Sequence, residues 1–385
     1  MMIRSFLPVG QGACCIEKFD LKDDERQNIT VLYDCGSSTS LDLLKACLKE
    51  NIKENSTIHA VFISHFDEDH VNGLPYILKH YRVKNLFIPL VTEEELHYLQ
   101  LICVTRLSFS LDRDFFYSFF KYFRSPHGLI PSDTTIYYVQ TYQSENITYE
   151  QKKQTRDRII PSGEDVSYRL LPNDNKEVMY EWQYIPYNFR QKARYDDLLN
   201  ELERAFNKRL TLNNILKLVE NDPKNCIVKI KKVFKKISGS LNANSMVLFS
   251  GPKYKRMAQV KYDVYRPTRF KCCASECCFN HIVKPGCLYM GDYDANGERK
   301  WDDLVNAFME YWELIGCIQI PHHGSRHNYN VELTNDRTRY YVISVGTDNK
   351  YRHPHDYVIK DMLFKGSLFS IVTEQKESEA SFIVR

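Results

Sequence analysis

The sequence lacks both a long hydrophobic run and a strong excess of charge of one sign. Its 52 Lys and Arg residues stand against 49 Asp and Glu, a formal net charge of +3, so only local patches can indicate nucleic acid. Apolar stretches such as residues 86–91 are far shorter than the roughly 18 to 20 residues that span a bilayer. Because Pro8 and Gly10 interrupt the N-terminus before a secretory signal forms, the sequence predicts a cytoplasmic protein without a membrane partner.

Cysteine is too sparse for a disulfide-built scaffold, with 12 in 385 residues, so we expect reduced thiols. The exception is a cysteine-rich loop at residues 272–287, which has the composition of a structural zinc site. Its candidate ligands are Cys272, Cys273, Cys277 and Cys278, followed by His281 and Cys287. The alternative is a reduced loop without metal, because this spacing is not a common zinc pattern.

Hydrophobic periodicity predicts an α/β protein. Residues 3–34 contain three strand-like segments, residues 40–48 have the spacing of an amphipathic helix, and residues 58–64 form a short apolar strand. Strand patterns return in the last third of the chain, at residues 245–249, 287–290, 317–320 and 340–344.

Residues 92–240 separate these two strand-rich parts and are predicted to be a largely helical, aromatic-rich insertion. Residues 93–123 are helical in pattern, and their aromatic residues favour a core or a face for a protein partner. Residues 188–240 shift to Lys, Glu, Asn and Leu with helical spacing. The Lys-rich run at 229–236 is either a solvated helix face or a patch that contacts phosphates.

Metal-ligand residue types are concentrated directly after the apolar strand. His65, Asp67, Asp69 and His70 fall within six residues. Alternate residues of an extended segment project to one side, and a turn at Asp69 brings His70 close by. A turn that only caps the next helix explains the carboxylates but not both histidines. The segment therefore predicts a site for metal, with room for two ions.

This segment, with others that follow it in order, resembles the metallo-β-lactamase-fold hydrolases, and most closely their ComEC-type competence branch. The matching segments are residues 6–12 (FLPVGQG), 32–36 (LYDCG), 65–70 (HFDEDH), 242–248 (NANSMVL), 290–292 (MGD), 320–325 (IPHHGS) and 351–355 (YRHPH). The resemblance implies a metallo-β-lactamase-like αββα sandwich without the membrane channel of competence proteins. Residues 1–91 and 241–385 would be its two halves, with residues 92–240 inserted between them.

The resemblance also implies a ligand set for one or two divalent ions. One ion would be held by His65 and Asp67, the second by Asp69, His70 and either His322 or His323, with Asp292 as the bridge. A third histidine at the first site is missing, since Asn244 and Ser245 occupy its place. This shift from imidazole to carboxylate favours Mn or Mg over Zn, although all three remain candidates.

Catalytic roles would fall to Asp69, Asp292 and His353. His353 either steadies the scissile phosphate or protonates the leaving oxygen; the alternative is a histidine packed beside Pro354 in a turn. Asp34 is expected to hold the loop geometry rather than to touch metal.

The predicted function is a metal-dependent phosphodiester hydrolase, a nuclease acting on DNA or RNA. Basic residues interleaved with aromatics support nucleic acid as a partner: Lys253, Lys255, Arg256, Lys261, Arg266, Arg269 and Lys271, with Tyr254, Tyr262, Tyr265 and Phe270. One alternative is hydrolysis of a small ester, lactone or nucleotide on the same fold. Another is a scaffold or partner-dependent effector with a weak site, which docks other proteins through the insertion.

Overall fold

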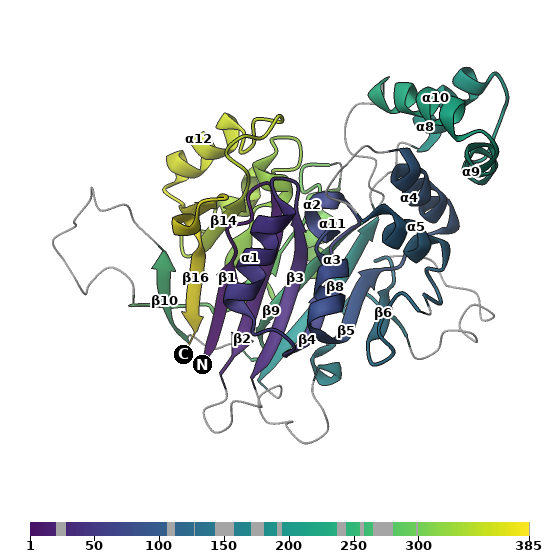
Figure 1. The fold of residues 1–385 in the computed structure, drawn as a ribbon. Helices are drawn as coiled ribbons and strands as arrows, with labels where there is room; N and C mark the ends of the chain where they lie inside the picture. Colours follow the sequence, from purple (N-terminus) through teal and green to yellow (C-terminus); the bar gives the residue numbers. More distant parts are fainter. Residues whose placement is uncertain are drawn as a thin grey trace.

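In the computed structural model two β-sheets pack face to face, with helices on both outer faces (Figure 1). The structure describes residues 1–20, 28–105, 112–126, 128–142, 158–170, 181–190, 195–236, 244–254, 258–264, 280–297 and 299–384. The predicted αββα sandwich is therefore confirmed. Among the described residues, no helix has the length and apolarity needed to cross a membrane.

The first sheet has ten strands in the order β11-β10-β16-β1-β2-β3-β4-β5-β6-β7. It is antiparallel from β11 to β3 and parallel from β3 to β7. Its strands are β1 (Met2–Phe6), β2 (Gly12–Phe19), β3 (Ile29–Ser37), β4 (Thr57–Phe62), β5 (Arg82–Pro89), β6 (Thr135–Val139), β7 (Ile159–Ile160), β10 (Ala258–Val264), β11 (Asn280–Val283) and β16 (Ala380–Val384).

The second sheet has six strands in the order β15-β14-β13-β12-β9-β8. Strands β12 to β15 run parallel to one another, whereas β8 and β9 form an antiparallel pair at the far side. Its strands are β8 (Trp182–Arg190), β9 (Asn244–Pro252), β12 (Gly286–Tyr289), β13 (Ile315–Gln319), β14 (Tyr340–Ser344) and β15 (Leu368–Val372).

Helices cover both sheets because the strands are apolar on both faces. In β3, Leu32 packs under the helices of the first sheet, whereas Val31 and Tyr33 face the second sheet. The helices over the first sheet are α1 (Leu41–Asn51), α2 (Glu68–Val71), α3 (Leu74–His80), α4 (Glu93–Thr105) and α5 (Arg113–Lys121), and those over the second are α11 (Lys300–Ala307) and α12 (Asp356–Lys365). The predicted helix at 40–48 is confirmed, and Ser40 caps it by accepting a hydrogen bond from the Leu43 N–H.

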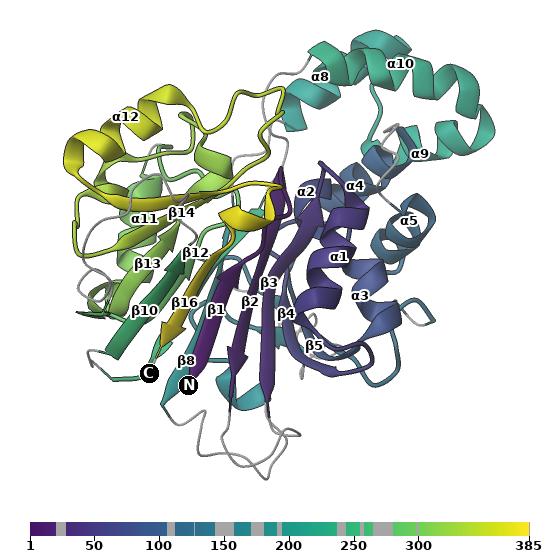
Figure 2. The same ribbon diagram turned by 60° about the vertical axis from the view of Figure 1, so that its left-hand side comes forward.

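The segment 92–240 is less uniformly helical than the sequence predicted. Its helices are α4, α5, α8 (Tyr195–Phe206), α9 (Leu212–Asn221) and α10 (Pro223–Lys236), and the last three lie together at one corner of the molecule beyond α4 (Figure 2). Strands β6 and β7, however, extend the first sheet, and β8 belongs to the second. The β-branched and aromatic residues of these segments, for example Ile136, Tyr138 and Val139 in β6, would have indicated strands.

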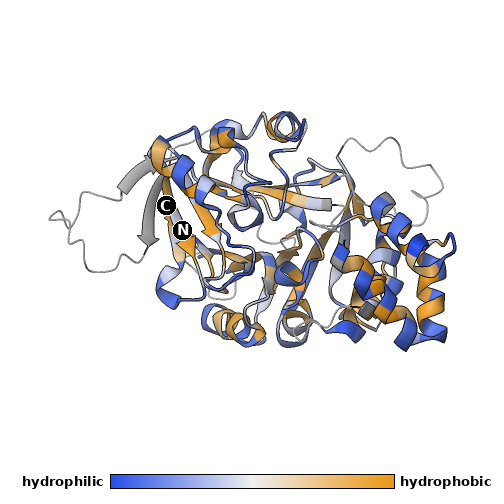
Figure 3. Cartoon of the chain, turned by 90° about the horizontal axis from the view of Figure 1, so that it is seen from above, coloured by the Kyte–Doolittle hydropathy of each residue, from blue (hydrophilic) through white to orange (hydrophobic). Residues whose placement is uncertain are grey.

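Amphipathic spacing explains how α8 to α10 attach to the domain. Leu198, Ile215 and Ile230, one from each helix, are buried in the same cluster as residues of α4. Hydrophilic and hydrophobic residues follow one another along these helices in Figure 3. On α10 the Lys-rich run is confirmed as a helix whose Ile230 and Val233 point inward, while Lys229 and Lys232 are exposed.

A buried ion pair of the first sheet is hydrogen-bonded to the second sheet. The Arg4 Nε of β1 donates to Glu17 Oε1 of β2 at 2.7 Å, and both side chains are almost completely buried. Three hydroxyls of the second sheet also donate to this carboxylate: Tyr289 at 2.9 Å, Tyr184 at 2.7 Å and Ser250 at 2.6 Å. Each oxygen of Glu17 thus accepts two hydrogen bonds, which compensates for its removal from water.

The cysteines of the described part are free and buried, in agreement with the expected reduced thiols: Cys14, Cys15, Cys35, Cys47, Cys103, Cys226, Cys287 and Cys317. The proposed zinc ligands Cys272, Cys273, Cys277 and Cys278 lie outside the described residues.

Candidate metal centre

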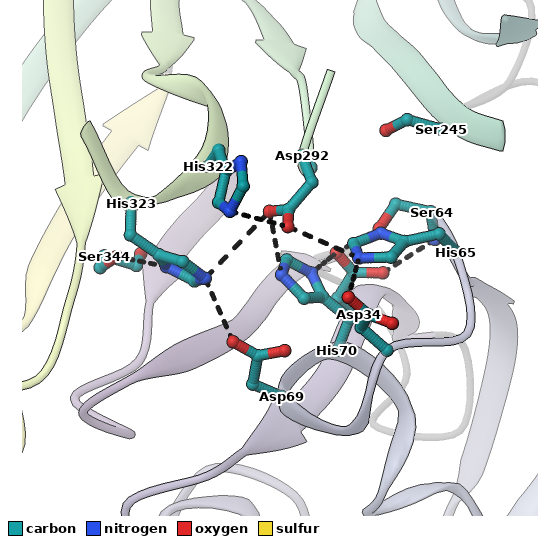
Figure 4. Close-up of polar contacts among 12 residues, drawn as sticks. Asp34, Ser64, His65, Asp69, His70, Ser245, Asp292, His322, His323 and Ser344 are labelled. Carbon is teal, nitrogen blue, oxygen red and sulfur yellow. Dashed lines mark hydrogen bonds and ion pairs between the residues drawn. The ribbon is translucent and has the colours of Figure 1, made fainter. Parts of the chain in front are cut away.

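The predicted ligands converge at one end of the sandwich, where strands of both sheets end (Figure 4). His65, Asp69 and His70 follow β4 of the first sheet, whereas Asp292 follows β12 and His322 and His323 follow β13 of the second. Since β12, β13 and β14 are parallel, their carboxyl ends meet at the same edge. The site is therefore shared between the two halves of the fold.

Two overlapping groups of side chains are close enough to hold metal ions. His65, His70 and Asp292 form one group, and Asp69, His70 and His323 the other; in each, the potential ligand atoms lie within 4.8 Å of one another. Asp292 stands between them, because its Oδ1 is 3.1 Å from His70 Nε2 and 4.0 Å from His323 Nε2, while its Oδ2 is 3.6 Å from His65 Nε2.

The histidines of the two groups, His65, His70 and His323, each use Nδ1 for a hydrogen bond outside the cluster. His70 Nδ1 donates to Asp34 Oδ2 at 2.8 Å, and His323 Nδ1 donates to the Ser344 carbonyl at 2.7 Å. His65 Nδ1 lies 2.8 Å from Ser64 Oγ, which donates its own proton to Asp34 and therefore accepts from the imidazole. These partners place the proton on Nδ1 and leave the lone pair on Nε2.

The donor set fits a divalent cation. The Nε2 atoms of His65, His70 and His323 are buried, and none has a hydrogen-bond partner in the part of the chain that the structure describes. Three buried lone pairs that face carboxylate oxygens need a cation between them, since an unmatched buried polar atom is costly. Imidazole nitrogens held by carboxylate, hydroxyl and carbonyl partners are the usual arrangement of metal-binding histidines.

The electrostatics of the cluster also favour a cation. Burial opposes the charged form of His70, but Asp292 and Asp34 outweigh it and hold its pKa well above the ordinary value. Burial likewise raises the pKa of Asp292, but its electrostatic interaction with the imidazoles of His322, His70 and His65 holds it well below its usual range. For Asp69, burial is again outweighed, here by the neighbouring imidazoles of His323 and His70, so that its pKa is lowered. Both carboxyls are thus ionised.

Local backbone geometry creates this convergence. His322 and His323 have φ values of 48° and 56°, in the left-handed region that side chains other than glycine rarely adopt. On the opposite side, a Cβ at Gly36 would lie 2.3 Å from the backbone carbonyl carbon of Asp69 and 2.3 Å from the His70 nitrogen. The end of β3 thus packs directly against the backbone that carries two ligands, and only glycine permits this approach.

The structure brings most of the predicted residues together. His65 lies in one group with His70 and Asp292, and Asp67, whose side chain is one-quarter exposed, has its Oδ2 3.9 Å from His65 Nε2. Asp67 stands at the N-terminus of α2, where its carbonyl accepts the His70 N–H. In this position its carboxylate lies at the rim and belongs to neither group.

The structure also separates the positions of His322 and His323. His323 is a member of the second group, and its Nε2 is 3.2 Å from Asp69 Oδ2. His322 is more exposed, with its Nε2 3.5 Å from Asp292 Oδ2, and its ring is 5.8 Å from that of the half-buried His353. Ser245, in the place of the missing histidine, bonds the Met290 carbonyl instead.

Sequence analysis missed Ser64 and Ser344, which orient the imidazoles. The role expected of Asp34 agrees with the structure: it accepts hydrogen bonds from the Ser64 N–H at 2.7 Å and hydroxyl at 2.8 Å as well as from His70. Ser344 acts through its backbone carbonyl, which every residue has, so its role cannot be read from the sequence.

We expect Asp34→Asn to weaken metal affinity by about 10- to 100-fold, because the partner that aligns His70 and Ser64 loses its charge. Competition titrations with a chromogenic chelator measure this. Asp42→Asn is the control, since the Asp42 side chain is 91% exposed on α1. Equal affinities for the two variants would contradict the assigned role of Asp34.

Comparison with known proteins matches the early motif to a family model. Residues 25–106 match the family model of the metallo-beta-lactamase superfamily. Among solved structures the chain is similar to human tRNase Z, short form, with 10% identity and a TM-score of 0.33 over 83% of this chain and 77% of that one. It is also similar to a long form RNase Z from yeast, with 9% identity and a TM-score of 0.33 over 83% of this chain and 32% of that one.

A search of curated proteins finds no match to the sequence. The family match includes β3, β4 and the segment that carries His65, Asp69 and His70. Residues 25–106 are therefore similar to the metallo-beta-lactamase superfamily over the part of the chain that supplies these ligands.

Proposed function

We propose that this protein is a metal-dependent phosphodiester hydrolase that cleaves nucleic acid. The observation that carries the proposal is the position of Asp292 between two ligand groups that share His70. A carboxylate in this position suits a pair of ions, and such pairs clamp the attacking and leaving oxygens of a phosphodiester. The order of motifs that resembles the ComEC-type branch supports the same reaction.

The two ligand groups share His70 and together offer three imidazoles and two carboxylates. This mixture suits Mn²⁺ or Zn²⁺ better than Mg²⁺, which prefers oxygen ligands. When bound, such ions supply an activated water and neutralise the charge of the phosphate. The protein's own residues hold the ions through Nε2 and carboxylate oxygens, and Asp34, Ser64 and Ser344 keep the imidazoles in the required orientation.

His353 is the candidate for contact with the substrate. Burial, together with the charges of His322 and His323, lowers its pKa to about 4, so its imidazole is neutral near pH 7. A neutral imidazole keeps one ring N–H, but it is too weak an acid to protonate the leaving oxygen. We therefore favour the first of its two predicted roles, in which a ring N–H donates a hydrogen bond to a phosphate oxygen.

Exposed cations support nucleic acid as the substrate. On α10, Lys224 and Lys232 are exposed and have no ion pair among the described residues. Lys229 and Lys236 on the same helix are also exposed; Lys229 lies over the Phe206 ring and Lys236 pairs with Glu201. Such a face attracts a phosphate backbone without selecting a base sequence.

The test is incubation of the purified protein with single- and double-stranded DNA and RNA in Mn²⁺, Mg²⁺ or Zn²⁺. The Asp69→Ala, His70→Ala double variant is the control. We expect cleavage that requires metal and is lost in the variant. Metal bound in stoichiometric amounts without cleavage of any polymer would contradict the nuclease and favour the hydrolysis of a small ester, lactone or nucleotide.

A further inference from the structure

A row of aromatic rings leads from the protein surface to the metal centre. The Tyr351 ring is stacked on His353 with their centroids 5.8 Å apart and an interplanar angle of 17°. The His353 ring in turn lies 5.8 Å from that of His322, whose Nε2 is 3.5 Å from Asp292. Tyr351 itself is 60% exposed. A large aromatic ring is therefore exposed to solvent, and the rings of His353 and His322 connect it to the cluster.

Cations flank this exposed ring. Lys350 Nζ lies 4.9 Å from the Tyr351 centroid, and neither Lys350 nor Arg352 forms an ion pair within the described residues. The segment 346–355 has a single carboxylate, Asp348. The rim thus offers an aromatic face beside two exposed cations, the combination that single-stranded nucleic-acid sites use for bases and phosphates.

Arg352 occupies a backbone conformation that would suit glycine. Its φ is 57°, and Asn349 holds the turn by accepting the His353 N–H and donating to the His353 carbonyl. Glycine takes this conformation without strain, whereas arginine keeps it at a cost. An exposed arginine in this strained conformation, one residue from His353, supports a role for its guanidinium at the site.

We propose that the substrate is single-stranded and that its base next to the scissile phosphate stacks on Tyr351, with Arg352 and Lys350 on the flanking phosphates. This inference rests on the proposed nuclease function. In a duplex both faces of a base are covered by neighbouring bases, so stacking on Tyr351 requires an unpaired, unstacked nucleotide. Lys350 is exposed and leaves the ring for a phosphate when the base arrives, because stacking outweighs an exposed cation–π contact.

The experiment compares kcat/KM on two single-stranded oligonucleotides of equal length, one with bases and one built of abasic tetrahydrofuran residues. We expect Tyr351→Ala to lower kcat/KM about 10- to 100-fold on the base-bearing strand, chiefly through KM, and far less on the abasic strand. Tyr351→Phe keeps the ring and is expected to match the wild type. Tyr168→Ala is the matched control, since Tyr168 is also 60% exposed but belongs to another part of the surface, next to Arg169, whose carbonyl accepts a hydrogen bond from Asn85 of β5.

Arg352→Gly tests the phosphate contact separately. Glycine keeps the left-handed backbone and removes only the cation, so we expect lower affinity for both strands, a salt dependence reduced by about one in log–log slope, and no loss in the unfolding midpoint.

Equal losses on the two strands, or none, for Tyr351→Ala would overturn the stacking site while leaving the nuclease intact. An Arg352→Gly salt slope equal to that of the wild type would overturn the phosphate contact. A wild-type protein that cleaves neither strand in any metal would overturn the nuclease, and the inference with it.

Discussion

Replacement of Asp292 by asparagine is expected to reduce hydrolysis by on the order of a thousandfold or more. Asp292 is 6% exposed, and its two oxygens face His70 and His323 on one side and His65 and His322 on the other. An amide keeps the shape but removes the charge that two cations would share. The measurement is kcat/KM on a single-stranded oligonucleotide, together with the metal content of the purified variant.

Asp294→Asn is the matched control for this change. Asp294 lies on the same loop, is only partly buried, and accepts a hydrogen bond from the Asn296 N–H. We expect its activity to stay within about twofold of the wild type, as for a surface substitution away from the site. If Asp292→Asn retained wild-type turnover, Asp292 would not lie between the ions and the two-metal arrangement would be wrong.

Replacement of Glu17 by alanine is expected to lower the free energy of unfolding strongly. This change leaves the Arg4 guanidinium buried without its carboxylate and removes the acceptor of the Tyr184, Ser250 and Tyr289 hydroxyls. Breaking a buried ion pair on one side costs about 3–5 kcal/mol, because the remaining charge is uncompensated. Urea unfolding at fixed metal concentration, followed by tryptophan fluorescence, measures the loss.

An ion pair at the protein surface is the control for the buried Arg4–Glu17 pair. Glu50 pairs with Lys376 at the surface, where both side chains are more than half exposed. Glu50→Ala is therefore expected to change the free energy of unfolding by less than about 1 kcal/mol. A loss for Glu17→Ala as small as that for Glu50→Ala would show that the network between the sheets contributes little to the stability of the sandwich.

Much of the fold could be predicted because its signals are local. Strands β1 to β4 and β12 to β14 are short runs rich in apolar and β-branched residues, a pattern that the sequence shows directly. Strands β6 and β8 were missed because they lie among helical segments, where composition averaged over a long window favours helix. Their place is set by pairing with β5 and β9, which are distant in sequence.

The sequence by itself determined the chemistry available at the site: histidines and aspartates after strands, with Asp34 as a support. Tertiary structure decided how they combine. The left-handed backbone at His322 and His323 turns the second ring into the cluster and leaves the first at the rim, and close packing at Gly36 positions Asp69 and His70. Asp67 stays outside, although it lies in the same motif. Residue types follow from local sequence, but which ligand atoms meet depends on two sheets brought together by the burial of the surface between them.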